Sequence, residues 1–272
     1  MNSRYDFSGH TVFVSGGTSG INLGIADAYA QAGARVAVMS RNAERVEAAR
    51  AQLARHGGEV MGLVGDVRDY AGVHEVLASV HARLGDIDVL VSGAAGNFLA
   101  PALGMSANGF KTVVDIDLNG TFHVLRAAHA FLRKPGASIV NITAPQSFNP
   151  APLQIHACAA KAGVDQIMRV LAMEWGGHGI RVNSISPGPI EGTEGVSRLI
   201  SESARASMAG RVPLRRLGQL ADIAAMALFL GSSDASYITG ALIPVDGGIA
   251  LLGARNYAVD ACEQLQALHP TP

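Results

Sequence analysis

The chain has 272 residues, a formal net charge of −1 at pH 7, and 49% hydrophobic but only 5% aromatic residues. This length fits one α/β domain, and the lack of a long run of Lys or Arg argues against nucleic-acid binding, which depends on such charge. No apolar stretch approaches the roughly 20 residues of a membrane span. Cys158 and Cys262 form no CxxC pair, so neither a disulfide framework nor a metal site is expected.

Short runs of β-branched and aliphatic residues alternate along the chain with Ala-rich stretches, in which apolar residues recur every three or four positions. This alternation predicts a Rossmann-like, doubly wound α/β fold, in which one parallel seven-stranded sheet carries helices on both faces. We expect a single domain over 1–272. The alternating pattern indicates a core at about 8–250 and a C-terminal tail at 251–272. The predicted strands are 11–16, 35–40, 59–66, 88–94, 138–143, 180–186 and 241–248, and the predicted helices include 23–34, 43–56 and 72–85.

A glycine-rich turn, SGGTSG at 15–20, follows the first predicted strand and precedes the first predicted helix. Glycines let the backbone approach a pyrophosphate, which the free N–H groups and the positive end of the helix then bind. The turn resembles the TGxxxGxG motif of the short-chain dehydrogenases, with Ser15 in place of Thr and Asn22 in place of the last Gly. Asn22 adds a side chain where the cofactor comes close. The resemblance assigns cofactor contacts to Ser15, Gly16, Thr18, Ser19, Gly20 and Ile21.

The end of the second predicted strand indicates which nicotinamide cofactor the chain binds. An NAD-specific protein of this fold presents a carboxylate there, whereas this chain has Ser40 followed by Arg41. The guanidinium of Arg41 is a fixed cation with donors suited to a 2′-phosphate, so NADPH is the expected cofactor. The resemblance assigns the adenine ring to Asp66 and Val67, and SGAAG at 92–96, which includes Ala94 and Ala95, takes the place of the family's NNAG element.

Three further segments together resemble one branch of that family, the 2,4-dienoyl-CoA reductases, especially the peroxisomal kind. They are AAGNF at 94–98, QIHACAAKAG at 154–163 and PGPIEGTEG at 187–195. The resemblance implies an acyl thioester substrate and a homotetramer that pairs helices from 106–134 and 155–176. The ending LHPTP is not a peroxisomal tripeptide, so a cytoplasmic protein is expected.

The second of these segments lacks the tyrosine that normally stands four residues before its lysine, because Ala157 occupies that position. A ketone reductase uses this Tyr as a general acid toward the carbonyl oxygen. A conjugated thioester has a different requirement, since hydride added at its far end sends charge to the thioester oxygen and the site must stabilise that charge. The missing Tyr therefore disfavours carbonyl reduction and leaves dienoyl reduction possible.

Three polar residues are the expected catalytic groups. By resemblance, Lys161 holds the nicotinamide ribose, and Asn97 helps to bind the thioester through an amide that can donate to an oxyanion. Asp117 occupies the position where most short-chain dehydrogenases have Asn. It can position a water, deliver a proton if burial raises its pKa, or simply pair with Lys161.

The loop ISPGPIEGT at 185–193 resembles the segment under the nicotinamide, and the resemblance gives cofactor contacts to Pro187, Gly188, Ile190 and Thr193. His156 is a second candidate proton source, and Asp246 has a capping or a catalytic role. Two alternatives to a dienoyl-CoA reductase stay open. One is a reductase of another activated alkene, imine or carbonyl compound, and the other is a protein that binds the cofactor without catalysis.

Overall fold

The computed structural model describes residues 5–193 and 202–253. Its centre is one parallel sheet of seven strands in the order β3-β2-β1-β4-β5-β6-β7. The order reverses between β1 and β4, which is where ligands of open α/β sheets bind, beyond the carboxyl ends of the strands. All seven predicted strands are confirmed. They are β1 Thr11–Ser15, β2 Arg35–Ser40, β3 Val60–Val64, β4 Val89–Ser92, β5 Ser138–Ile142, β6 Arg181–Pro187 and β7 Leu242–Val245.

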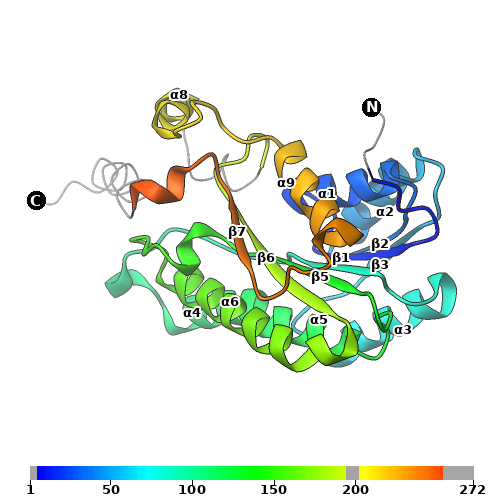
Figure 1. The fold of residues 1–272 in the computed structure, drawn as a ribbon. Coiled ribbons are helices and arrows are strands. Elements are labelled where there is room, and N and C mark those ends of the chain that lie inside the picture. The colour runs from blue at the N-terminus through cyan, green and yellow to red at the C-terminus, as the bar shows by residue number, and fades with distance from the viewer. Residues whose placement is uncertain (1–4, 194–201, 254–272) are drawn as a thin grey trace, which may run out of the picture.

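Helices cover both faces of the sheet, as the alternating pattern predicts (Figure 1). One face carries α1 Gly20–Gln31, α2 Ala43–Ala54 and α9 Leu220–Gly231, and the other carries α3 Tyr70–Leu84, α4 Ala107–Val114, α5 Gly120–Ala128 and α6 Ile155–Trp175. Helix α8 Glu202–Arg211 lies apart from these layers, above the carboxyl ends of the strands. The π-helical segment η2 is Asp115–Asn119, and the 3₁₀ turns are η1 Ala102–Gly104, η3 Pro145–Ser147, η4 Gly176–His178, η5 Ser233–Ala235 and η6 Ile249–Leu252.

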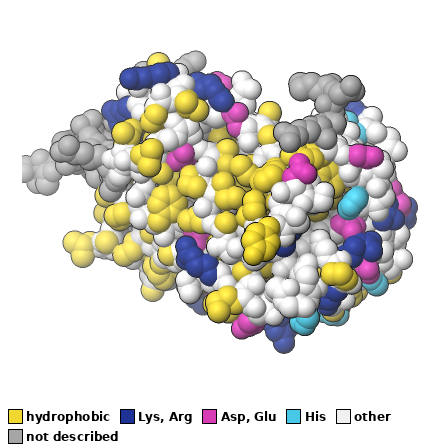
Figure 2. All heavy atoms as spheres, in the orientation of Figure 1, with side chains coloured by type: hydrophobic (Ala, Val, Ile, Leu, Met, Phe, Trp, Pro, Cys, Tyr) yellow, Lys and Arg dark blue, Asp and Glu magenta, His cyan; other side chains and the backbone are white. Residues whose placement is uncertain are grey.

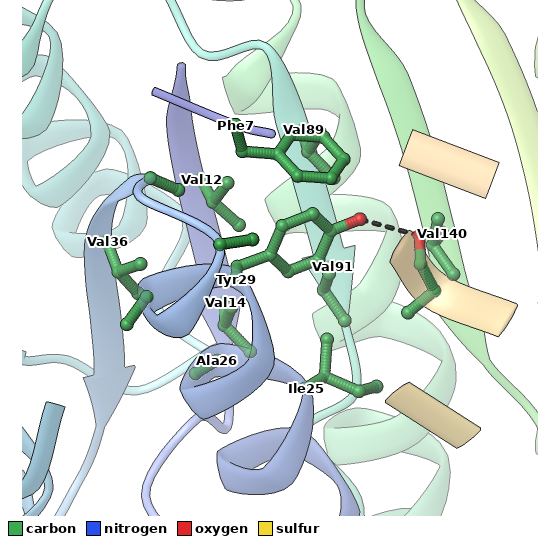
Figure 3. Close-up of a cluster of buried hydrophobic side chains, with 14 of the residues drawn as sticks. Phe7, Val12, Val14, Ile25, Ala26, Tyr29, Val36, Val89, Val91 and Val140 are labelled. Atoms are coloured by element: carbon green, nitrogen blue, oxygen red, sulfur yellow. Dashed lines mark hydrogen bonds between the residues drawn. The ribbon is translucent and has the colours of Figure 1, made fainter. Parts of the chain in front are cut away.

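Each face of the sheet has its own hydrophobic core, built largely from Val, Leu, Ile and Ala. Tyr29 of α1 is the largest fully buried side chain on the α1 face (Figure 3). Its ring packs edge-on against Phe7 at 4.8 Å between centroids, and its hydroxyl donates to the Ala227 carbonyl of α9 at 2.6 Å. Burial raises the pKa of Tyr29 above its ordinary value. One side chain therefore joins two helices that are distant in sequence.

The helices differ from the prediction mainly at their ends. Helix α1 begins at Gly20, three residues before the predicted start, because the glycine turn leads directly into its first turn. The helical stretch 106–134 is a succession of α4, the π-helical segment and α5. Within the residues that the structure describes, no helix is long and apolar enough to cross a bilayer. Cys262 and most of the predicted tail, 254–272, lie outside the described residues.

Candidate functional site

Two adjoining pockets lie at the carboxyl ends of the strands, on either side of the first turn of α1. They share Ser19, Asn22, Gly93, Ala95 and Gly96 as walls. The β2-side pocket is also lined by Gly16, Thr18, Met39, Ser40, Arg41, Arg45, Gly65, Asp66, Val67, Ala94 and Ile116. The β5-side pocket is also lined by Gly20, Ile21, Asn97, Asp117, Ile142, Thr143, Ala144, Gln146, Ala157, Lys161 and Thr193. Sequence positions nearly 180 residues apart thus form one continuous cleft.

The glycine turn has the geometry of a phosphate cradle. Gly16 has a φ of +72°, and a Cβ on it would lie 2.8 Å from the Cα of Ala94, so only glycine fits. Ser19 precedes α1 and makes no side-chain cap, and the first turn of the helix contains no acidic residue. The N–H groups and positive dipole end of α1 are therefore available to an anion in the cleft. On this observation the residues fit a dinucleotide pyrophosphate.

Two arginines line the β2-side pocket, although the sequence argument singled out only one of them. Arg41 follows β2 directly, and Arg45 lies in the first turn of α2. The Asn42 side chain caps α2 by accepting a hydrogen bond from the Arg45 N–H at 2.8 Å. Recognition of Asn42 as a helix cap would have placed Arg45 beside Arg41. On the opposite wall, the Arg68 guanidinium pairs with Asp66 and lowers the pKa of that carboxyl.

A buried ion pair lies in the β5-side pocket. Lys161 Nζ is 3.4 Å from Asp117 Oδ2, and the two side chains are 9% and 2% exposed. Lys161 also donates to the Ile142 carbonyl at 3.2 Å, and Asp117 Oδ1 accepts the Gly96 N–H at 2.7 Å. Burial raises the pKa of Asp117 above its ordinary value, and Lys161 is the main group that opposes this shift. Of the three sequence-based roles for Asp117, pairing with Lys161 is observed.

Asp117 belongs to the π-helical segment between α4 and α5. A π turn widens the helix locally and often occurs at functional sites. Thr121 supports the turn by donating its hydroxyl to the Asp117 carbonyl at 2.7 Å. The π segment thus presents the Asp117 side chain to the cleft. On its outer side, the exposed Asn119 donates to the partly buried Asp115.

A cluster of three amide side chains forms the next part of the wall. Asn97 Nδ2 donates to Gln154 Oε1 at 2.6 Å, and Gln146 Nε2 donates to the same oxygen at 3.1 Å. An amide nitrogen carries two hydrogens, so Asn97 keeps one donor for a ligand. Gln146 and Gln154 were missed by sequence reasoning, because they lie next to short turns without periodic pattern.

Three more residues complete the chemistry of this pocket. Ala157 lines it at the position of the absent tyrosine, and the buried Thr143 hydroxyl has no hydrogen-bond partner among the described residues. His156 is fully buried, and its ring lies 4.4 Å from that of Phe98, centroid to centroid. Burial lowers the pKa of His156, so its ring is neutral at pH 7.

Some predicted cofactor residues lie outside these two pockets. Ser15 is buried at the end of β1, and Pro187 is buried at the end of β6. Gly188 and Ile190 line a separate pocket together with Asp246. Thr193, in contrast, lines the β5-side pocket. Asp246 accepts the N–H groups of Gly248 and Ala250 at 2.8 and 2.9 Å, which is the capping role.

Fold and cleft define the class of protein: a dinucleotide-binding oxidoreductase of the Rossmann type. The family model described as enoyl-(acyl carrier protein) reductase matches residues 16–250. A short-chain type dehydrogenase/reductase from Mycobacterium ulcerans has a similar solved structure, with a TM-score of 0.89, 31% identity, and coverage of 97% of this chain and 96% of its own. The chain belongs to the short-chain dehydrogenase/reductase family, in the group that this family model describes.

Two curated relatives have the same name, peroxisomal 2,4-dienoyl-CoA reductase, (3E)-enoyl-CoA-producing. The protein from Pongo abelii is 45% identical over 241 residues, which are 87% of this chain and 82% of its own. The protein from Arabidopsis thaliana is 40% identical over 267 residues, which are 94% of this chain and 90% of its own. The resemblance inferred from three short segments is therefore confirmed over most of the chain.

Proposed function

We propose that this protein reduces a 2,4-dienoyl-CoA, or a similar conjugated acyl thioester, with NADPH and gives an enoyl thioester. The observation that carries the proposal is the buried Asp117–Lys161 pair, in a pocket where Ala157 replaces the usual acid. The names of the two relatives support it. A ketone substrate needs a proton at oxygen, whereas a dienoyl thioester needs charge stabilisation at oxygen and a proton at carbon.

NADPH rather than NADH is favoured by the charges at the end of β2. Arg41 and Arg45 line the pocket there, and Ser40 leaves it without the carboxylate that would bind ribose hydroxyls and repel a 2′-phosphate. Arg41→Ala should weaken NADPH binding roughly tenfold or more and leave NADH binding nearly unchanged. Arg50→Ala is a matched control, because Arg50 lies on α2, shortly after Arg41, and pairs with Glu47 on the surface.

When bound, the nicotinamide supplies a hydride to the far carbon of the diene, C5. The C4–C5 electron pair would then shift to C3–C4, the C2–C3 pair to C1–C2, and the carbonyl pair to the thioester oxygen. Asn97 keeps one N–H for that oxygen, and the unpaired Thr143 hydroxyl is a second donor on the same wall. The Lys161 ammonium adds a positive charge in a pocket of low dielectric constant. These groups stabilise the enolate without donating a proton to it.

The proton that completes the reaction goes to carbon. Asp117 is the acidic group in this pocket, and its carboxylate holds a water whose proton forms the new C–H bond at C2. Lys161 then gives a proton to the hydroxide that remains and regains one from solvent. Protonation at C2 leaves the double bond at C3, which agrees with the (3E)-enoyl product in the names of both relatives.

The acyl chain is expected to leave the pocket over an apolar rim. Phe98 and Phe148 are exposed and lie on the two loops that carry Asn97 and Gln146. Figure 2 shows hydrophobic side chains gathered across the middle of the face that lies between α8 and α6 in Figure 1. We expect the segment 194–216 to line part of the acyl pocket, and this segment lies partly outside the described residues.

The first experiment is NADPH oxidation by the purified protein with a 2,4-dienoyl-CoA, a 2-enoyl-CoA and a 3-ketoacyl-CoA, with NADH as the cofactor control. Turnover of the dienoyl thioester alone is the expected result. Turnover of the ketone would overturn the mechanism, since it requires an acid in place of the tyrosine. NADPH binding without turnover of any acceptor would favour a non-catalytic binding protein.

We also propose a homotetramer built on α5 and α6. Phe122 of α5 and Val170 and Met173 of α6 are 45%, 42% and 86% exposed, which is unusual for large apolar side chains on adjacent helices. Light scattering should give four times the chain mass of 28.1 kDa, and Met173→Glu should reduce it. Cytoplasmic location stays a prediction, which fractionation of producing cells tests.

A further inference from the structure

Asn22 stands at the junction of the two pockets and lines both. It is the third residue of α1, where the motif of the family has glycine. Its Nδ2 donates to the Gly93 carbonyl at 2.7 Å and lies 3.4 Å from the Gly16 carbonyl. One side chain therefore joins the glycine turn after β1 to the loop after β4.

These contacts fix the orientation of the amide. Both neighbours of Nδ2 are carbonyl oxygens, which only accept hydrogen bonds, so a flipped amide would set its own oxygen against them. The observed orientation leaves Oδ1 beside the Cα of Gly93, at the junction of the two pockets. Oδ1 is buried and has no hydrogen-bond partner within the described part of the chain. A buried carbonyl oxygen without a partner is a candidate acceptor for a donor from a ligand or an ordered water.

The cleft limits what that donor is. A phosphate offers only acceptors, and the N–H groups of α1 are the natural partners of a pyrophosphate here. The hydroxyls of the two riboses that flank a pyrophosphate are donors. We propose that Asn22 is a dinucleotide-positioning residue, which accepts a hydrogen bond from a ribose hydroxyl through Oδ1 while Nδ2 clamps the Gly93 loop. This inference rests on the dinucleotide binding proposed above.

A second observation couples Asn22 to Gly93. A Cβ on Gly93 would lie 2.2 Å from Asn22 Oδ1 and 2.6 Å from its Cγ, which no real contact allows. Gly93 has no positive φ, so the Asn22 side chain, and not the backbone, excludes a larger residue. The family pattern described above has Gly at position 22 and Asn at position 93. In this chain position 22 on α1 supplies the amide, and position 93 after β4 supplies the glycine.

The experiment measures NADPH affinity by titration calorimetry for the wild type, Asn22→Ala, Gly93→Ala and the double variant. Asn22→Ala should weaken binding roughly threefold to tenfold, the effect of one neutral hydrogen bond. Gly93→Ala should weaken NADPH binding more in the wild-type background than in the Asn22→Ala background. In the latter background the Asn22 side chain is absent, so the new Cβ does not clash with it. The exchange variant Asn22→Gly with Gly93→Asn should bind NADPH better than Gly93→Asn alone.

Controls separate this inference from the proposed function. Asn119→Ala removes an exposed amide outside the cleft and should bind NADPH as the wild type does. Titration with 2′,5′-ADP shows which ribose is involved, since a contact on the nicotinamide side would leave this fragment unaffected by Asn22→Ala. Wild-type protein that binds neither NADPH nor NADH would overturn both proposals. Normal NADPH binding by folded Asn22→Ala, or independent effects at positions 22 and 93, would overturn this one alone.

Discussion

Replacement of Asp117 by Asn tests the buried ion pair directly. The change keeps the shape of the side chain and an oxygen that can accept the Gly96 N–H, but it removes the negative charge beside Lys161. At 3.4 Å the attraction between the two charges is about 5 kcal/mol with an effective dielectric constant of about 20. Much of this is offset by the desolvation that both groups already carry.

Loss of one partner leaves the other as an uncompensated buried charge, which typically costs about 3–5 kcal/mol. Because the amide retains one hydrogen bond, we expect a loss of about 3 kcal/mol, or a decrease in melting temperature of roughly 6–12 °C. The assay is thermal unfolding at fixed protein concentration. Asp115→Asn is the matched control, because Asp115 lies two residues away and pairs with Lys111 on the surface, where such pairs contribute little. Equal melting temperatures for the two variants would refute the reasoning.

Three further predictions concern the amide wall, the pH dependence and the α1 core. Asn97→Ala should lower kcat about tenfold or more with NADPH affinity unchanged, because the group acts on developing charge; an unaltered kcat would return Asn97 to a structural role. Since burial raises the pKa of Asp117, the carboxylate is protonated at a higher pH than an ordinary Asp, and the rate should fall on acidification before that ordinary range is reached; a wild-type profile in Asp117→Asn would contradict this. Tyr29→Phe removes the hydrogen bond from the hydroxyl to the Ala227 carbonyl, which keeps its bond within α9, and should lower the free energy of unfolding by about 1 kcal/mol in denaturant titrations, with activity of the folded protein retained.

The fold was predictable from the sequence because its signals are local and repeated. Each strand is a short aliphatic run, and the order of strands and helices restricts the sheet to few topologies. The start of α1 was placed three residues late, since Gly20 and Asn22 are poor helix formers, and their helical conformation comes from the turn before them. Tertiary context decides such ends, and propensity does not.

The residues of the candidate site were predictable from the sequence only where a recognisable motif assigned them a role. Lys161, Asp117 and Asn97 lie in the same pocket, as the resemblance implies, but the resemblance assigns no role to Gln154, although Gln154 begins one of the segments that carry it. Arg45 had a readable signal in the cap Asn42, which places it in the first turn of α2. The orientation of the Asn22 amide could not be predicted, because it depends on two carbonyls that are 77 residues apart in sequence.

The π-helical segment Asp115–Asn119 makes the site sensitive to chain length as well as to residue identity. A π turn is in effect one residue inserted into an α-helix, and helical side chains are spaced by about 100°. Deletion of one residue between α4 and α5 would let the two helices merge, and every side chain before the deletion would rotate by about that angle relative to those after it. Relatives of this protein can therefore differ at many positions on these helices, but insertions and deletions in the π-helical segment should be selected against.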